Sequence, residues 1–155
     1  MLIGAQTLMY LTMATSNVVD LLGSAFGWSD SGWRSGNVAW VQQVVSQGHV
    51  GIGSPRMWAY LAVIFAATFE LLAGIGWAGA SLGLLARDVP RARRWASRGA
   101  ASALTVWLGL ALGREVCIAY ETQGWEQFLV ISLLAIGTWL AIELLPLEPR
   151  DDTPS

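Results

Sequence analysis

Five polar residues interrupt the long apolar runs of this sequence, and they are the residues whose chemistry needs an explanation. An ionisable side chain inside a bilayer costs about 2.5–3.5 kcal/mol to insert, so such groups normally face the interior of a helix bundle and pair with one another. A cluster of this kind can relay protons or ions, or it can be an ion pair that fixes the register of the helices. The five residues are Asn17, Asp20, Glu70, Arg114 and Glu115.

Arg114 favours the structural interpretation, because its guanidinium can neutralise a neighbouring carboxylate. Tyr60 and Tyr120 are taken as markers of the outer membrane boundary. Measured from them, Glu70 lies deeper than Arg114 by about 6 Å, at ~1.5 Å of helical rise per residue. An arginine side chain can cover that distance. We therefore expect a salt bridge from Arg114 to Glu70 or to Asp20, and the relay stays open as the second interpretation.

Other kinds of chemistry lack the residues that they need. His49 and Cys117 are the single histidine and the single cysteine, and no cluster of thiolates or carboxylates lies near the histidine in the sequence to complete a zinc site. Neither a set of nucleophile, base and orienting group nor a glycine-rich phosphate loop after a strand is visible. We expect no catalytic residue, no metal, no cofactor and no enzymatic activity.

The composition indicates that lipid is the solvent. Apolar residues make up 54% of the chain and charged residues 13%, whereas a soluble domain averages roughly 25% charged residues. The formal charge of -2 excludes a strongly basic surface for nucleic acid. The partner that we expect first is therefore the lipid bilayer.

Four apolar runs approach the ~20 residues that a helix needs to cross a bilayer. Between the second and third runs, residues 87–98 form a short basic loop, and residues 121–126 form a tight polar turn before the fourth. The sequence therefore predicts a single four-span membrane domain over 1–147 and a polar tail over 148–155. The expected spans are about 2–26, 58–86, 99–120 and 127–145.

The outer segment between the first two spans, 27–57, has a different pattern. Val38, Val41 and Val45 recur at helical spacing, and glutamines occupy the other side. This pattern is typical of an amphipathic helix, and it is too short to span. The fold class that we expect is all-α: a polytopic membrane protein with four transmembrane helices and an amphipathic outer helix between spans one and two.

Two glycine pairs predict close packing of helices: Gly79 with Gly83, and Gly109 with Gly113. Glycine at this spacing lets helix backbones approach each other in a bilayer, where no hydrophobic effect drives helices together. The pairs could pack the spans of one chain, which we favour, or they could mark a face for another subunit or a second copy.

A series of short motifs occurs in order along nearly the whole chain. They are Asn17-Val-Val-Asp20, Val41-Gln-Gln-Val-Val-Ser46, Pro55-Arg-Met-Trp58 with Glu70 after it, and Glu115 followed by Thr122-Gln-Gly-Trp125. By these motifs the chain resembles the bacterial predicted small integral membrane proteins grouped as domain-of-unknown-function family 2165. Gln43 stands where that family favours histidine. The resemblance implies a four-span bacterial membrane protein and implies no particular activity.

Charge bias predicts the orientation in a bacterial inner (plasma) membrane. Arginines near the ends of spans resist translocation, and short loops count most in this bias. We expect the basic segment and both termini to face the cytoplasm, with the first run kept as a span rather than removed as a signal peptide. The arginines of the basic segment are Arg87, Arg91, Arg93, Arg94 and Arg98.

Two functions fit these expectations. The first is a non-catalytic accessory or stabilising subunit of a larger bacterial membrane complex, favoured by the small size and by the lack of a reactive centre. The alternative is a small proton- or ion-coupled transporter, formed as a homodimer, that uses Glu70 or Glu115 as its membrane carboxylate. Association with other membrane subunits or with itself is expected in both cases.

Overall fold

The computed structural model describes residues 2–27, 35–47, 53–116 and 125–146, with the backbone alone described for 114–116 and 125–127. Within these ranges the chain forms five α-helices and no strand, so the all-α prediction is confirmed. The helices are α1 (Leu2–Phe26), α2 (Asn37–Gln47), α3 (Pro55–Leu85), α4 (Val89–Val116) and α5 (Trp125–Glu143).

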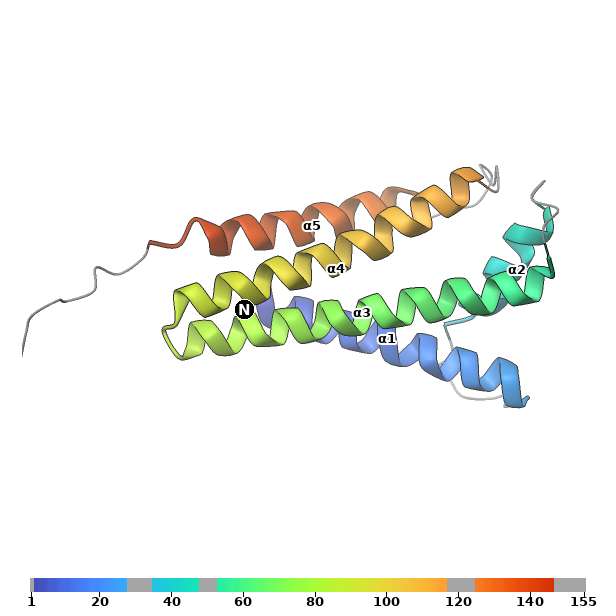
Figure 1. Cartoon of the computed structure of the whole chain (residues 1–155), viewed down its shortest axis with the longest axis horizontal. Helices are drawn as coiled ribbons and strands as arrows, with labels where there is room; N and C mark the ends of the chain where they lie inside the picture. Colours follow the sequence, from blue (N-terminus) through green and yellow to red (C-terminus); the bar gives the residue numbers. More distant parts are fainter. Residues whose placement is uncertain (1, 28–34, 48–52, 117–124, 147–155) are drawn as a thin grey trace, which may run out of the picture.

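The four long helices run roughly along one direction, and α3 is central among them (Figure 1). It packs against α1, α2 and α4, whereas α5 packs mainly on α4. The pair α1/α3 and the pair α4/α5 lie close together at the end where α3 turns into α4, and they diverge toward the end that holds α2 (Figure 1). The bundle is therefore closed at one end and splayed at the other.

Small residues hold α3 and α4 together near the closed end. A Cβ built on Gly76 would lie 2.4 Å from the Cα of Gly99, and one built on Gly83 would lie 2.7 Å from the backbone nitrogen of Ala92. A Cβ on Gly79 would overlap the Trp95 ring at 2.5 Å. Only glycine permits helix backbones to approach this closely. Gly79 and Gly83 thus pack two helices of the same chain.

The second predicted glycine pair behaves differently. A Cβ built on Gly109 would meet the ring of Phe65 at 3.0 Å, whereas a Cβ on Gly113 would meet nothing within 4 Å. The contact between α3 and α4, which we call the seam, therefore ends between Gly109 and Gly113.

The turn between α3 and α4 is much shorter than the sequence indicated. The basic segment was expected to be a loop, but α4 already begins at Val89 and includes most of it. The carboxylate of Asp88 accepts a hydrogen bond from the backbone N–H of Arg91 at 2.9 Å and caps the helix. A capping aspartate and a proline in the first turn, Pro90, both favour a helix start here. The prediction of a loop over 87–98 is wrong for this reason.

The amphipathic helix expected in the segment 27–57 is confirmed as α2. Val38 and Val44 are its buried residues, and Val38 packs with Ala59 and Val63 of α3 in a small apolar cluster. The valine spacing therefore located the helix correctly, and it attaches to α3 beside the splayed end of the bundle (Figure 1).

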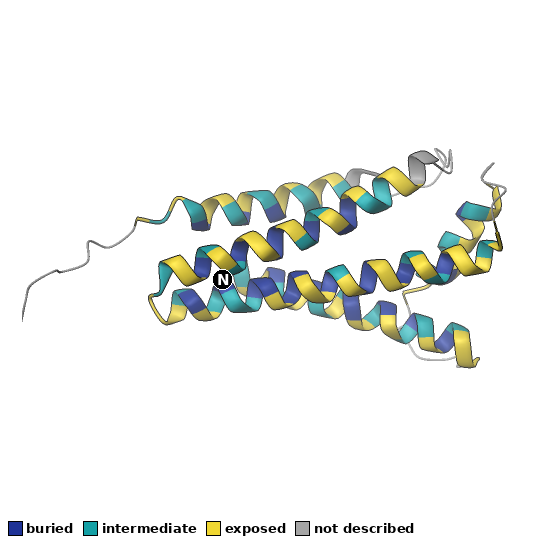
Figure 2. Ribbon diagram, in the orientation of Figure 1, coloured by how far each residue is buried: buried dark blue, intermediate teal, exposed yellow. Residues whose placement is uncertain are grey.

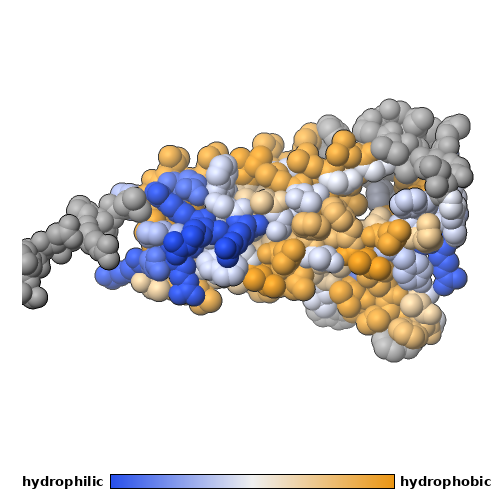
Figure 3. Space-filling view, viewed as in Figure 1, coloured by the Kyte–Doolittle hydropathy of each residue, from blue (hydrophilic) through white to orange (hydrophobic). Residues whose placement is uncertain are grey.

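The interior and the surface of the bundle differ in an unusual way. Buried apolar positions are held mostly by alanine, together with a few large residues such as Trp77. By contrast, each long helix exposes leucine: Leu8 is 69% exposed, Leu82 61%, Leu112 65% and Leu133 65%. Exposed residues follow the outer faces of the helices in Figure 2, and apolar side chains cover the middle of the face seen in Figure 3. Soluble monomers rarely expose apolar surface on this scale.

Among the described residues, α3 is the one helix that is both long and apolar enough to cross a membrane. It has 31 residues, or ~46 Å at the usual rise, against a hydrocarbon core of about 30 Å. Residues Phe128–Glu143 of α5 form an apolar helix that is shorter. The structure thus bears out one candidate span, and the four-span arrangement remains a proposal.

Candidate functional site

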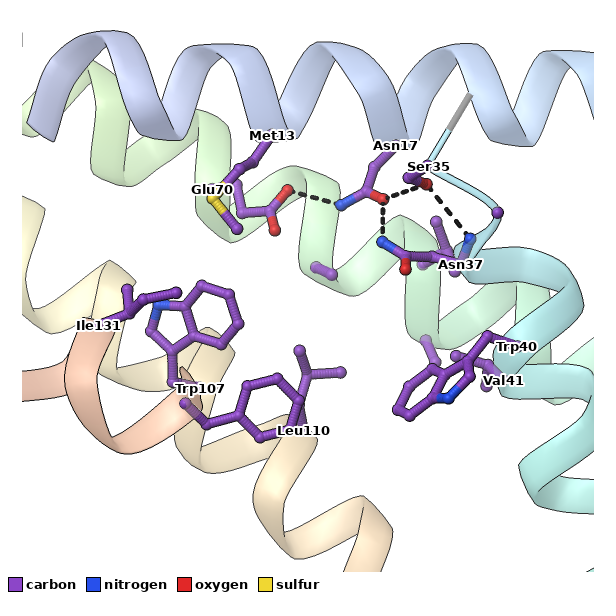
Figure 4. Close-up of a pocket in the computed structure, with 15 residues that line it drawn as sticks. Met13, Asn17, Ser35, Asn37, Trp40, Val41, Glu70, Trp107, Leu110 and Ile131 are labelled. Atoms are coloured by element: carbon purple, nitrogen blue, oxygen red, sulfur yellow. Dashed lines mark hydrogen bonds between the residues drawn. The ribbon is translucent and has the colours of Figure 1, made fainter. Parts of the chain in front are cut away.

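A cavity of about 400 Å³ lies between the α1/α3 pair and the α4/α5 pair, next to α2. Its walls differ in chemistry (Figure 4). On the α1/α3 side and at the start of α2, the walls include Asn17, Glu70, Ser35 and Asn37. On the α4/α5 side the walls are apolar and aromatic. The splayed end of the bundle therefore encloses an amphipathic space.

Glu70 is the carboxylate of this cavity. Its side chain comes from the middle of α3, and the residue is only 2% exposed. One oxygen, Oε2, accepts a hydrogen bond from Nδ2 of Asn17 at 2.7 Å. The second oxygen points away from that bond, toward the cavity (Figure 4), and has no hydrogen-bond partner among the described residues. A buried carboxylate with one oxygen held and one oxygen free can take up a proton or a positively charged group.

Asn17 connects this carboxylate to α2. Its Oδ1 accepts a hydrogen bond from Nδ2 of Asn37 at 2.7 Å and another from Oγ of Ser35 at 3.0 Å. Asn17 itself is 2% exposed, so these bonds form in a largely dehydrated setting, where an unpaired amide would be costly. One amide thus joins α1, α3 and the start of α2.

Asp20 has a different role from that of Glu70. Its Oδ2 accepts a hydrogen bond from the backbone N–H of Val38 at 2.8 Å and one from Oγ of Ser35 at 3.4 Å. A carboxylate at this place neutralises the positive end of the helix dipole and satisfies a free N–H of the first turn. Asp20 is fully buried but does not line the cavity. It fixes α2 to α1.

The aromatic wall of the cavity is built around Trp107. Its indole Nε1–H donates a hydrogen bond to the hydroxyl of Tyr10 at 3.1 Å, and its ring lies 5.4 Å from the ring of Phe128. Trp40 of α2 lines the cavity as well. Because the indole N–H of Trp107 is already bonded to Tyr10, Trp107 presents only the apolar part of its ring to the cavity.

The side chains of Arg114 and Glu115 lie outside the described residues, so their pairing stays a prediction. The backbone of α4 nevertheless changes the expected depth. Gly109 lies beside Phe65, and continuing this antiparallel register places position 114 about 15 Å along the axis from Glu70, at ~1.5 Å per residue. The depth difference of about 6 Å inferred from the two tyrosines is therefore too small.

A second polar cluster joins α4 and α5 at the closed end. Arg93 and Glu143 form an ion pair with Nε and Oε2 3.8 Å apart, and Nη2 of Arg93 donates a hydrogen bond to the backbone carbonyl of Leu145 at 2.6 Å. A cation at the carboxyl end of a helix is favourable. This cluster was not anticipated, because residue 93 was assigned to a loop.

The sequence pointed to Asn17 and Glu70, and the structure brings these two residues together. It did not point to Ser35, Asn37 or Trp107, which complete the site. Ser35 and Asn37 lie together at the start of α2 and Trp107 lies on α4, and no pattern of spacing unites two segments that meet only in the folded chain. His49 and Cys117 are outside the described residues, and within the described part no group of His, Cys, Asp or Glu side chains could hold a metal ion.

Comparison of the chain with known protein families, with curated proteins and with solved structures finds no match. The resemblance suggested by the motifs thus stays a prediction, and the geometry of the cavity is the basis for a functional interpretation.

Proposed function

We propose that the protein is an all-helical membrane protein in which α1, α3, α4 and α5 each cross the bilayer. The exposed leucines on all four helices support this arrangement, because they would face lipid while alanine and glycine pack inside. The length of α1 supports it too: 25 residues give ~37 Å at the usual rise. The proposed membrane is the bacterial inner membrane.

The proposed orientation places the closed end of the bundle, with its arginines from Arg87 to Arg98, in the cytoplasm together with both termini. Arginines close to the ends of spans resist translocation whether they lie in a loop or in the first turns of a helix. The splayed end and α2 then face outward. Hydrophilic residues gather at the turn between α3 and α4, next to the apolar middle of the molecule (Figure 3).

Of the two functions expected from the sequence, we favour a small proton- or ion-coupled carrier. The observation that supports it is Glu70, a buried carboxylate that lines a cavity between two pairs of helices. A structural ion pair would need a cation beside this carboxylate, and no basic side chain in the described ranges contacts it. Intramembrane carboxylates that face a cavity mark pathways for ions and substrates.

In this mechanism the free oxygen of Glu70 exchanges a proton for a bound substrate. Asn17 holds the other oxygen in place, and through Asn37 and Ser35 it links the carboxylate to the start of α2. A change at the carboxylate is therefore transmitted to the helix beside the opening. A carrier needs two states that substrate and proton bind differently, and closure of the splayed end supplies the second state.

Accessibility of the cavity from the two sides of the membrane tests the carrier. Ala66 lines the cavity one helical turn from Glu70, and a single cysteine there, with Cys117 replaced by serine, reports whether water reaches it. We expect a membrane-impermeant thiol reagent to label Ala66→Cys from the outside and, in inverted vesicles, from the inside. The control is Leu82→Cys, at a position that would face lipid, which neither side should label.

Labelling of position 66 from one side alone, or from neither, would contradict the carrier. It would favour the second candidate, an accessory subunit of a larger membrane complex. That candidate draws on the exposed helical glycines Gly113 and Gly137, where a Cβ would meet nothing within 4 Å. Small exposed residues of this kind let a neighbouring helix approach closely.

A further inference from the structure

The cavity holds a carboxylate that no cation balances among the described residues. Among its described lining residues Glu70 is the one acidic side chain, and no basic side chain lines it. By helix register, the backbone of Arg114 lies about 15 Å from Glu70 along the axis, toward the splayed end. Between helices the effective dielectric constant is low, so a carboxylate attracts a cation far more strongly than it would in water. The charge of Glu70 therefore favours a positively charged ligand over a neutral or an anionic one.

The opposite wall suits an organic cation rather than a metal ion. Trp107, Phe128 and Trp40 line the cavity, and the indole N–H of Trp107 is already donated to Tyr10. Hard metal ions need several oxygen ligands, whereas aromatic rings attract the diffuse charge of an ammonium group through their π-faces. Leu110 extends this wall with aliphatic surface. The wall thus matches an ammonium group that carries an apolar body.

The size of the cavity limits that body. A volume of about 400 Å³ lies near the lower end of the range for pockets that bind small organic molecules, roughly 300–1,000 Å³. It accommodates one aromatic ring or a short branched alkyl chain together with the charged head. Long acyl chains and large fused ring systems would exceed it.

We propose that the cavity binds a small lipophilic ammonium ion, with the positive head against the free oxygen of Glu70 and the apolar body against Trp107 and Phe128. This inference rests on the proposed carrier, because it names the class of substrate that the carrier takes. The bound ammonium replaces the proton of the carboxylate, so uptake of one positive charge balances release of one proton.

The test compares two ligands of similar size that differ in charge. Benzyltrimethylammonium is a cation, and N,N-dimethylbenzamide is neutral, with the same number of non-hydrogen atoms. Isothermal titration calorimetry on the full chain in lipid nanodiscs, with empty nanodiscs as the blank, measures both affinities. We expect the cation to bind at least about tenfold more tightly than the amide, a factor that corresponds to ~1.4 kcal/mol.

Variants identify the groups responsible. Glu70→Gln keeps the size of the side chain and an oxygen for the Asn17 bond, and it should lower the affinity for the cation by about tenfold or more while the amide changes less than about twofold. Glu143→Gln is the matched control, because this carboxylate pairs with Arg93 outside the cavity, and it should leave both affinities unchanged. Phe128→Leu should weaken cation binding by about threefold through loss of a π-face.

The outcomes separate the two proposals. Equal affinity for the two ligands, or a Glu70→Gln variant that keeps the preference for the cation, would overturn the ammonium site even if position 66 is labelled from both sides. Selective binding of the cation together with one-sided labelling would overturn the carrier and keep the site. A misfolded Glu70→Gln variant is recognised by the loss of its near-ultraviolet circular dichroism. In that case Phe128→Leu tests the ammonium site, and an unchanged affinity for the cation in this variant would overturn it.

Discussion

At the scale of single residues, Asn17 is the residue on which the site depends. An amide has both a donor and an acceptor end, and here the donor end holds Glu70 while the acceptor end holds Asn37 and Ser35. Neither a carboxylate nor an apolar side chain could serve both purposes. The sequence identified Asn17 as part of a polar cluster, but it could not show what the two ends of the amide contact.

Replacing Asn17 by alanine should therefore destabilise the protein. The substitution leaves Oε2 of Glu70 without its described donor and Asn37 without its acceptor, and an unpaired buried polar group costs about 1–3 kcal/mol. Unfolding in mixed micelles of increasing denaturing detergent measures the effect. Thr15→Ala is the control on the same helix, since the exposed Thr15 hydroxyl bonds only to the carbonyl of Leu11; its expected change is below about 0.5 kcal/mol. Equal stability of the two variants would contradict this role.

At the scale of helices, the sequence predicted α2 well and α4 poorly, for opposite reasons. Valine spacing is a local pattern, so it located α2 without any knowledge of the fold. The arginines near the start of α4 suggested a loop because of their charge, although Asp88 and Pro90 give a local signal for a helix start. The attachment of α2 was beyond prediction, because it depends on Asp20, a residue of another helix.

Asp20→Ala should loosen α2 while leaving the long helices intact. The carboxylate caps the helix through the Val38 N–H, and loss of such a cap costs about 0.5–2 kcal/mol. Opening of α2 should then become roughly twofold to thirtyfold more frequent. Hydrogen–deuterium exchange followed by mass spectrometry measures this in peptides from 38–47, with peptides from α3 as the internal reference. Unchanged exchange in 38–47 would show that the Asp20 cap does not hold α2 in place.

At the scale of the whole molecule, the bundle combines an alanine-rich interior with a leucine-rich exterior. The sequence predicted the apolar runs and their helical state, because length and hydropathy are local properties. It could not predict that α3 and α4 meet at Gly76 and Gly99, since small residues occur on several faces of both helices. The splay of the two pairs, and with it the cavity, follows from where that contact lies.

Gly76→Ala should separate the α1/α3 pair from the α4/α5 pair and destabilise the fold. The added Cβ would lie 2.4 Å from a backbone atom of Gly99, a position that no side-chain rotation can relieve, and such overpacking costs about 1–3 kcal/mol. Gly113→Ala is the matched control, because nothing lies within 4 Å of its Cβ. That variant should be neutral or more stable by up to ~1 kcal/mol, through helix propensity. Thermal unfolding in nanodiscs compares the pair, and equal melting temperatures would refute the importance of the seam.

The close contact of Gly76 with Gly99 also has a mechanical consequence. It lies toward one end of α3, and α2 is attached to α1 and α3 rather than to α4, so α1, α2 and α3 form one lever arm and α4 with α5 the other. The contact between the two arms continues as far as the ring of Phe65, which lies beside Gly109. From Phe65 to the start of α3 is ~15 Å at the usual rise. A rotation of about 10° about this contact would move the far tip of the arm by about 3 Å over that length. A small tilt that leaves the glycine contact in place thus changes the width of the splayed end, where Trp40 is carried with the moving arm.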